Sequence, residues 1–250
     1  MDFCKVKTNI AYKVVIGICL TAATVLANQT IIVPGQFALA EAGSSDNAPL
    51  GASEQHFQQV FSSALLTNIS VGNWIDGIAF RVEGNETAVP AQTIPIYNIS
   101  LSQSPNAPGS LSASFANNRG ADFLTVRSGA LTLNAGDFPG GGSPNNLGWI
   151  PFSSPYQYQG GDLLIEVAYQ GFSAGRDADA VYPFTANLAQ TAFGNGYNST
   201  TADAGLYAEA LVMGFSITSV LDPIPEPSAY FIIGVGFFLL LFRPSPKNLW

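Results

Sequence analysis

The chain has few of the side chains on which most enzyme and metal sites depend. It has a single histidine, His56, and only two cysteines, Cys4 and Cys19, both near the N-terminus. Zinc sites and Ser-His-Asp triads use histidine, and disulfides and thiolate metal sites need grouped cysteines. We therefore expect no disulfide and no thiolate metal site after residue 19, and a surface or packing role for His56.

Lysine is missing from the middle of the chain. Between Gly43 and Ile224 the basic residues are four arginines, against fourteen acidic residues, which gives a net charge of −10. Nucleic-acid binding and attraction to anionic lipids both need clustered basic residues. The composition thus argues against nucleic acid as a partner and predicts repulsion from anionic membrane surfaces.

The C-terminal part of the chain has a distinctive order of elements. Pro225-Glu226-Pro227 precedes an uncharged apolar run, Ala229–Phe242, which is followed by Arg243 and Lys247. As a helix the run would be about 21 Å long, against a hydrocarbon core of about 30 Å. This predicts a short transmembrane helix whose basic tail is held on the cytoplasmic side. The alternative, a buried C-terminal helix, would normally show a polar face.

This arrangement resembles the PEP-CTERM sorting domain of exported bacterial proteins. The resemblance implies that a membrane-embedded exosortase recognises Pro225, Glu226 and Pro227 and processes the chain near them. It also implies a membrane-bound intermediate and a final place at the cell surface or in the extracellular polysaccharide of a biofilm matrix. The family tail is usually a tight arginine cluster, whereas here Arg243 is followed by Pro-Ser-Pro and Lys247, a departure that concerns the retention step.

The N-terminus is typical of an export signal. Three lysines precede an apolar segment, Val14–Ala27, and small-residue cleavage sites follow it. We expect a signal peptide over residues 1–42, with an uncleaved N-terminal anchor as the alternative. The cleavage sites considered are Ala38-Leu39-Ala40, Ala40-Glu41-Ala42 and, as an earlier option, Val25-Leu26-Ala27.

The remaining chain is expected to be a flexible leader (43–53), one all-β domain (54–220) and the sorting signal (221–250). Apolar residues alternate with polar ones in several segments, which predicts half-buried antiparallel strands. These strands, joined by Gly/Pro-rich loops, favour a two-sheet, jelly-roll-like β-sandwich. The alternating segments are Ile78–Val82, Tyr97–Leu101, Leu163–Tyr169 and Leu211–Ile217.

Two further details of the sandwich can be predicted. Leu124–Val126 and Leu131–Leu133 flank Ser128-Gly129, which suggests a hairpin, and Phe57–Phe61 is the expected first strand. Short phrases such as Gln58–Phe61 resemble those of other exported proteins with this tail. In those proteins the region is an uncharacterised β-sandwich, so the resemblance implies no activity.

Aromatic and acidic residues are the candidates for a binding or catalytic site. Trp74, Trp149, Tyr156 and Tyr158 could contact a glycan, although aromatic rings also fill the ends of a sandwich core. Glycosidases use carboxyl pairs, and Asp162 with Glu166 is the first candidate pair, for which a solvated face is the favoured interpretation.

Two more acidic features are candidates for a site. Glu209 shares the inward parity of Leu211, with Arg81 or Arg127 as a candidate partner, but a solvated strand end is favoured. Asp177-Ala178-Asp179, joined by Asp203, could supply oxygen ligands to calcium, although a solvated loop is the simpler interpretation.

Together these observations predict an exported, non-catalytic protein of the cell surface or polysaccharide matrix, without a cofactor or bound metal. Its β-sandwich would have a structural or glycan-contacting role. Its expected partners are an exosortase-type enzyme, the membrane before processing, and extracellular polysaccharide. The alternatives are a polysaccharide hydrolase or lyase that uses acidic residues, and a calcium-dependent adhesin.

Overall fold

Strands make up nearly all of the regular structure in the computed structural model, which describes residues 27–219. Within these residues no helix is long and apolar enough to cross a membrane. The strands are β1 (Ala27–Val33), β2 (Ser44–Asp46), β3 (Gln55–Phe61), β4 (Trp74–Arg81), β5 (Gln92–Ile94), β6 (Tyr97–Gln103), β7 (Leu124–Arg127), β8 (Leu131–Leu133), β9 (Leu147–Gln157), β10 (Leu163–Tyr169), β11 (Ala178–Val181), β12 (Ala189–Asn195), β13 (Gly205–Tyr207), β14 (Ala210–Leu211) and β15 (Met213–Ser219). Three short 3-10 turns complete the set: η1 (Gly35–Phe37), η2 (Ser63–Leu65) and η3 (Phe115–Asn118).

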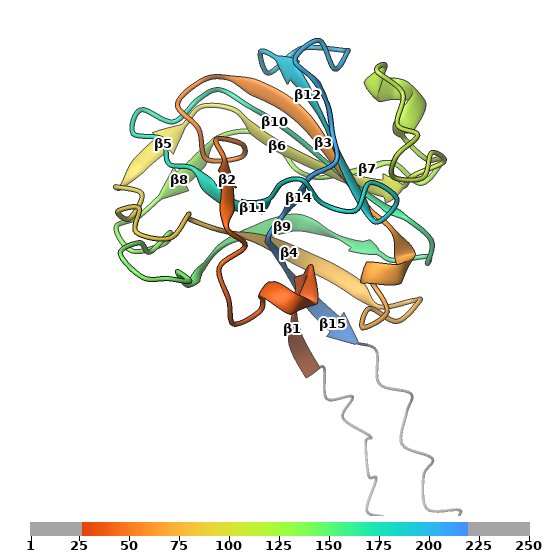
Figure 1. Ribbon diagram of the computed structural model, residues 1–250, viewed down its shortest axis with the longest axis horizontal. Coiled ribbons are helices and arrows are strands. Elements are labelled where there is room, and N and C mark those ends of the chain that lie inside the picture. Colours follow the sequence, from red (N-terminus) through yellow and green to blue (C-terminus); the bar gives the residue numbers. More distant parts are fainter. Residues whose placement is uncertain (1–26, 220–250) are drawn as a thin grey trace, which may run out of the picture. The chain divides into compact units, whose positions relative to one another are not determined.

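Two antiparallel sheets form the sandwich (Figure 1). One has the strand order β1-β15-β4-β9 and the other the order β13-β12-β3-β10-β6-β7. Their inner faces pack together through alternate apolar residues, and the rings of Phe61 and Phe215 meet edge to face across the core at 6.4 Å between centroids. This confirms the predicted all-β, two-sheet sandwich.

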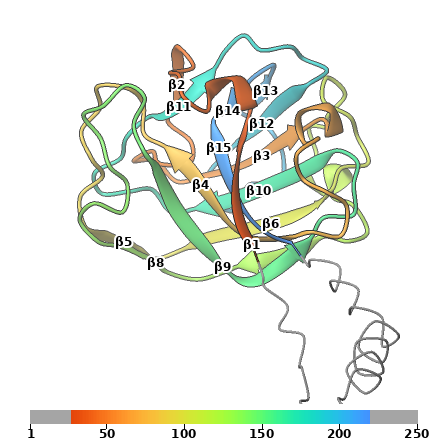
Figure 2. The ribbon, with the colours of Figure 1, turned by 90° about the horizontal axis from the view of Figure 1, so that it is seen from below.

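Two smaller sheets flank the sandwich (Figure 2). Strands β14, β11 and β2 form one of them, with β11 in the centre, and β5 pairs with β8 to form the other. The three-stranded sheet brings β2, from the early part of the described chain, together with β14, from its late part, through their shared neighbour β11.

The alternating segments predict the strands well. Leu163–Tyr169 coincides with β10, and its apolar residues Leu163, Ile165, Val167 and Tyr169 are all buried in the core. The segments near Ile78, Tyr97 and Phe215 correspond to β4, β6 and β15. A period of two therefore identified the inner face of both main sheets.

The predicted hairpin at Ser128-Gly129 is wrong. Strands β7 and β8 do form on either side of it, but β7 pairs with β6 and β8 pairs with β5, in different sheets. Gly129 has a positive φ of 91°, and its carbonyl accepts a hydrogen bond from the Tyr97 amide. The turn thus redirects the chain from one sheet to another instead of folding it back on itself.

The sandwich begins well before the predicted start at residue 54. Strand β1 pairs with β15 along its whole length, from Ala27 opposite Ser219 to Val33 opposite Met213. Val33 is fully buried, as is Leu50 in the predicted leader. Phe57–Phe61 lies in β3 and is therefore not the first strand. These apolar side chains complete the core, which is why residues 27–53 belong to the domain.

The signal peptide predicted over residues 1–42 overlaps the domain, because β1 and η1 lie within residues 27–42, and the rest of the predicted terminal signals lies outside the described residues. The apolar segment Val14–Ala27, except for its last residue, precedes residue 27. The sorting motif Pro225, Glu226 and Pro227, the predicted transmembrane run and the basic residues Arg243 and Lys247 follow residue 219. The export and sorting predictions therefore stay predictions.

Candidate functional site

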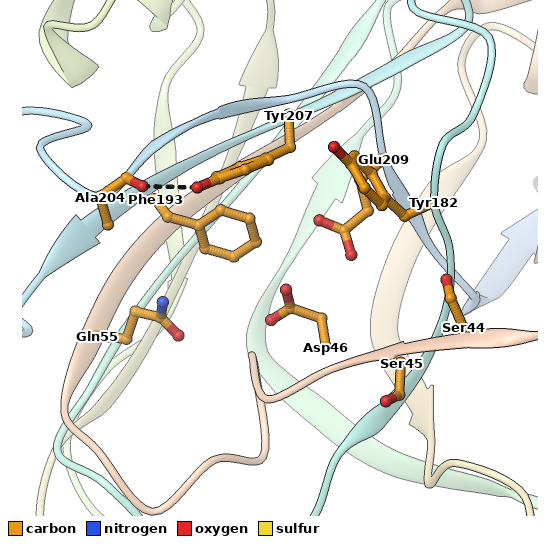
Figure 3. A pocket seen from close by; sticks show the side chains of 9 residues that line it. All are labelled: Ser44, Ser45, Asp46, Gln55, Tyr182, Phe193, Ala204, Tyr207 and Glu209. Atoms are coloured by element: carbon orange, nitrogen blue, oxygen red, sulfur yellow. Dashed lines mark hydrogen bonds between the residues drawn. The ribbon is translucent and has the colours of Figure 1, made fainter.

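A cleft with acidic and aromatic walls lies between the three-stranded sheet and the end of the six-stranded sheet (Figure 3). Its volume is about 340 Å³, which is at the lower end of the range for small-molecule sites. We call it the acidic cleft, and nine residues line it: Ser44, Ser45, Asp46, Gln55, Tyr182, Phe193, Ala204, Tyr207 and Glu209.

Strand pairing brings these residues together. Asp46 ends β2, opposite Ala178 of β11. At the other end of β11, Val181 pairs with Ala210 of β14, so that Tyr182 and Glu209, the next residues, come close together. Tyr207 lies at the end of β13, the edge strand next to β12. Three loops and four strands therefore meet at one cleft.

Glu209 is held in place through its backbone. Its carbonyl oxygen accepts hydrogen bonds from Gln59 Nε2 at 3.2 Å and Thr191 Oγ1 at 3.4 Å. Gln59 is fully buried, and its Oε1 accepts from the Leu211 amide at 3.1 Å. The Glu209 side chain is only 4% exposed and points into the cleft toward Asp46.

The structure corrects the favoured interpretation of Glu209 as a solvated strand end. The alternation that Glu209 shares with Leu211 indicated an inward-facing side chain, and the residue is indeed buried. Arg81 and Arg127, the candidate partners, are bonded elsewhere, to Asp179 and to the Ala130 carbonyl. Within residues 27–219 no hydrogen bond reaches the Glu209 carboxyl group. The backbone of Glu209 is thus held by hydrogen bonds, whereas its carboxyl group has no partner.

The surroundings make both cleft acids harder to ionise. Burial, reinforced by the charge of Asp46, raises the pKa of Glu209 to about 8. Burial also raises the pKa of Asp46, with a further contribution from Asp177, although the Ala48 amide donates to Asp46 Oδ1 at 2.7 Å and opposes the rise. Glu209 is therefore mostly protonated at neutral pH while the cleft is empty.

Two tyrosine rings form the aromatic wall of the cleft. Tyr182 is 55% exposed and Tyr207 39% exposed, and their rings meet edge to face at 6.2 Å between centroids. Phe193 packs behind Tyr207 at 5.7 Å, and Tyr207 Oη donates to the Ala204 carbonyl at 3.0 Å. Sequence reasoning missed both tyrosines, because Tyr182 directly follows the short strand β11 and Tyr207 ends the short strand β13, and neither segment shows a periodic pattern.

Two of the four predicted glycan contacts are core residues. Tyr156 and Tyr158 are 2% and 3% exposed, and their hydroxyl groups donate to Asp122 Oδ2 and to the Gly161 carbonyl, both at 2.6 Å. Their ring faces are therefore closed to a ligand. The structure therefore confirms the alternative role, in which these two rings fill the core.

The two tryptophans lie on the four-stranded sheet, away from the acidic cleft. Trp149 of β9 is 38% exposed and lines a shallow groove of about 290 Å³ together with Asp76, Gly77, Pro151 and Ser216. It stands opposite Ala79 of β4, whereas Trp74 stands opposite Gln157. The two tryptophans thus lie at different positions along β4 and β9. The four predicted aromatic residues do not form one binding surface.

The predicted carboxyl pair Asp162 and Glu166 does not form a solvated face. Glu166 is 7% exposed and accepts hydrogen bonds from Arg119 Nε at 2.9 Å and Gln58 Nε2 at 2.6 Å. The buried His56 ring places Nε2 3.0 Å from Glu166 Oε1. Asp162 instead accepts from the Ser63 amide at 2.8 Å. The two acids therefore have separate structural roles.

The cluster around Glu166 changes its pKa strongly. Burial alone would raise the pKa, but hydrogen bonds from His56, Arg119 and Gln58 outweigh burial and lower the pKa to about 2. Phe115 of η3 packs on the His56 ring at 4.4 Å between centroids. This face of β10 looked solvated in the sequence because the covering segment, residues 111–119, comes from a distant loop.

The acidic residues that lie close enough together to bind a metal ion are not the ones predicted for calcium. Carboxylate oxygens of Glu41, Glu83 and Asp179 lie within 4.8 Å of one another. They are donors of the kind that calcium uses, but the fully buried Asp179 already accepts from Arg81 Nε at 2.7 Å. Asp177 accepts from Ser45 Oγ, and Asp203 accepts from the Asn195 amide, so neither joins this group.

Comparison with known proteins adds no family assignment. No protein-family model matches the chain, and no curated protein matches it either.

Proposed function

We propose that the protein is an exported, non-catalytic β-sandwich that contacts a glycan through the acidic cleft. The carrying observation is the wall of the cleft, in which the exposed rings of Tyr182 and Tyr207 stand beside carboxyl, hydroxyl and amide groups. A sugar ring needs this combination, because its C–H face packs on an aromatic ring while its hydroxyl groups form hydrogen bonds.

The terminal sequences support a role outside the cytoplasm. The export signal, the Pro225-Glu226-Pro227 motif and the lysine-free, cysteine-free composition between them suit a protein that is sorted to the cell surface or polysaccharide matrix. Processing by an exosortase-type enzyme and a membrane-bound intermediate belong to the same proposal. A small cleft suits one sugar unit of a longer polymer, as expected for a matrix-bound module.

Oligosaccharide binding by the purified full chain tests the cleft as the contact site. We expect Tyr182→Ala and Tyr207→Ala each to weaken binding by about tenfold, because an aromatic contact of this size contributes about 1 kcal/mol or more. Trp149→Ala, which removes an exposed ring on the other sheet, is the matched control and should bind like the unaltered chain. Loss of binding in the tryptophan variant alone would move the site to the groove of β9.

A second candidate function follows from the two acids of the cleft. Asp46 and Glu209 face one another, and Glu209 is protonated at neutral pH, as a general acid must be. An acid-catalysed polysaccharide hydrolase would release new reducing ends from a bound polymer, and Glu209→Gln would abolish that release. Binding without any release of reducing ends favours the non-catalytic role.

A further inference from the structure

Among residues 27–219, no positively charged side chain lines the acidic cleft. Its nine lining residues include two carboxylic acids, Asp46 and Glu209, and no lysine, arginine or histidine. The charge of Asp177 also acts on Asp46. The described residues therefore give this cavity two acidic groups and no basic group to pair with them.

The arginines of the described chain, residues 27–219, cannot supply this charge, because each is bonded elsewhere. Arg81 pairs with Asp179 and Arg119 with Glu166. Arg127 donates to the Ala130 carbonyl, and Arg176 donates to the Thr87 carbonyl and lies near Glu86. No lysine lies between residues 27 and 219.

Glu209 is the acid of the cleft wall whose carboxyl group has no hydrogen-bond partner among the described residues. It is more than nine-tenths buried, its backbone is fixed by Gln59 and Thr191, and its carboxyl group points into the cleft without a hydrogen bond from the described residues. A buried carboxylate is stable only when it is paired and hydrogen-bonded. An ammonium group is a three-fold donor and would satisfy Glu209 and Asp46 together.

The aromatic wall fits the same kind of ligand. Tyr182 and Tyr207 present exposed rings next to the two acids. A cation is attracted to the face of an aromatic ring, and more strongly where water is excluded. The rings can therefore hold both the apolar face of a sugar and the charge beside it.

We propose that the acidic cleft selects a sugar unit that carries a free, positively charged amino group, which lies between Asp46 and Glu209. This inference rests on the proposed glycan-binding role and narrows it to amino sugars without an N-acyl group. An N-acetyl group would remove the charge and leave Glu209 without an ionic partner.

Calorimetry on the full chain at neutral pH tests the inference with three probes. They are a glucosamine trisaccharide, its N-acetylated counterpart, and ethylamine as a cation without a sugar. We expect the glucosamine form to bind at least about tenfold more tightly than the other two, because only it uses the acids and the rings together.

Two charge variants and a control show which groups select the amine. Glu209→Gln and Asp46→Asn should each reduce the preference for the glucosamine form to about one while N-acetylated binding is retained. Glu54→Gln removes an exposed acid outside the cleft wall and should leave the preference unchanged. Thermal unfolding of each variant shows whether it is folded.

The outcomes separate this inference from the function on which it rests. Equal affinity for the two trisaccharides would overturn the amine selectivity and leave glycan binding standing. Ethylamine that binds as tightly as the glucosamine form would mean that the cleft holds a cation and needs no sugar. Binding of neither trisaccharide would overturn the glycan proposal and the inference together.

Discussion

At the scale of single residues, Glu209 and Glu166 show how two buried glutamates acquire opposite properties. Glu209 is buried and faces a second acid, and its carboxyl group has no hydrogen-bond partner within the described residues, so its pKa rises to about 8. Glu166 is surrounded by His56, Arg119 and Gln58, so its pKa falls to about 2. Burial acts on both in the same direction, and the partners decide the result.

The raised pKa of Glu209 predicts a loss of stability in alkaline solution. Its folded pKa of about 8 lies above the ordinary value of 4.5. Its stabilising contribution is therefore complete below pH 4.5 and is lost as pH rises through 8. We expect Glu209→Gln to be more stable than the unaltered chain by about 1–3 kcal/mol at pH 9, and close to it at pH 5. Urea unfolding at both pH values checks this, and a pH-independent difference would contradict it.

Glu166 predicts the opposite pH dependence. Its folded pKa of about 2 lies below 4.5, so its contribution is present above pH 4.5 and disappears as pH falls toward 2. We expect Glu166→Gln to cost about 2–4 kcal/mol at pH 7, because it removes the negative charge that pairs with Arg119 and replaces one of the two acceptor oxygens with an NH2 donor. Chemical unfolding of both proteins between pH 7 and pH 2.5 should show the difference shrinking. Asp162→Asn, a change in the other predicted acid, is the control.

At the scale of elements, Arg81 joins strand β4 to the segment that follows β1. The side chain is 2% exposed and donates to the Phe37 carbonyl at 2.9 Å, the Ala40 carbonyl at 2.7 Å and Asp179. One guanidinium group thus binds β4, the 37–40 segment and β11. The short β2 and its part of the acidic cleft come directly after that segment.

This contact predicts a large and specific destabilisation. Arg81→Ala would leave the Asp179 carboxylate buried without its ion pair, and we expect a cost of about 3–5 kcal/mol in the free energy of unfolding. Asp179→Ala alone should cost a similar amount, and the double variant clearly less than the sum. A double-mutant cycle from urea unfolding measures this coupling, and additive costs would show that the two groups act independently.

The strands were largely predictable, but the surroundings of their outer faces were not. Alternation identified β4, β6, β10 and β15, because each has one face in the shared core. It could not show that Leu111 and Phe115 cover the second face of β10, since that contact depends on a distant loop. For the same reason Glu166 looked solvated and Ser128-Gly129 looked like a hairpin. Periodicity describes one strand, whereas partners depend on the whole topology.

The acidic cleft was less predictable still. Parity indicated that Glu209 points inward, but Asp46 lay in a predicted leader, and Tyr182 and Tyr207 had no distinguishing pattern. Asp46, Tyr182 and Glu209 meet because β11 pairs with β2 on one side and with β14 on the other, and Tyr207 joins them from β13, which pairs with β12. Sites assembled from short strands give little local signal, because each strand supplies at most three neighbouring lining residues.

At the scale of the whole molecule, the position of β1 favours one of the three cleavage sites of the proposed export signal. Cleavage after Ala40 or Ala42 would remove β1, with the buried Val33, and both carbonyl acceptors of Arg81 in the 37–40 segment. We therefore expect cleavage at the earlier option, Val25-Leu26-Ala27, so that the exported protein begins at Asn28. N-terminal sequencing of the exported protein checks this, and a start at residue 41 or 43 would contradict it.

The pairing of β1 with β15, from Ala27 opposite Ser219 onward, affects how the domain would respond to a pulling force. The segment from Glu209 to Ser219 runs from the cleft through β14 and β15 to the end of the described chain. A ligand that pulls at the cleft and a tether beyond Ser219 would therefore stretch one segment between them. Antiparallel hydrogen bonds stand perpendicular to the strands, and β15 has a neighbour on each side. Tension along β15 would thus act in shear on both rows of bonds at once, a geometry that resists extraction of the strand under flow.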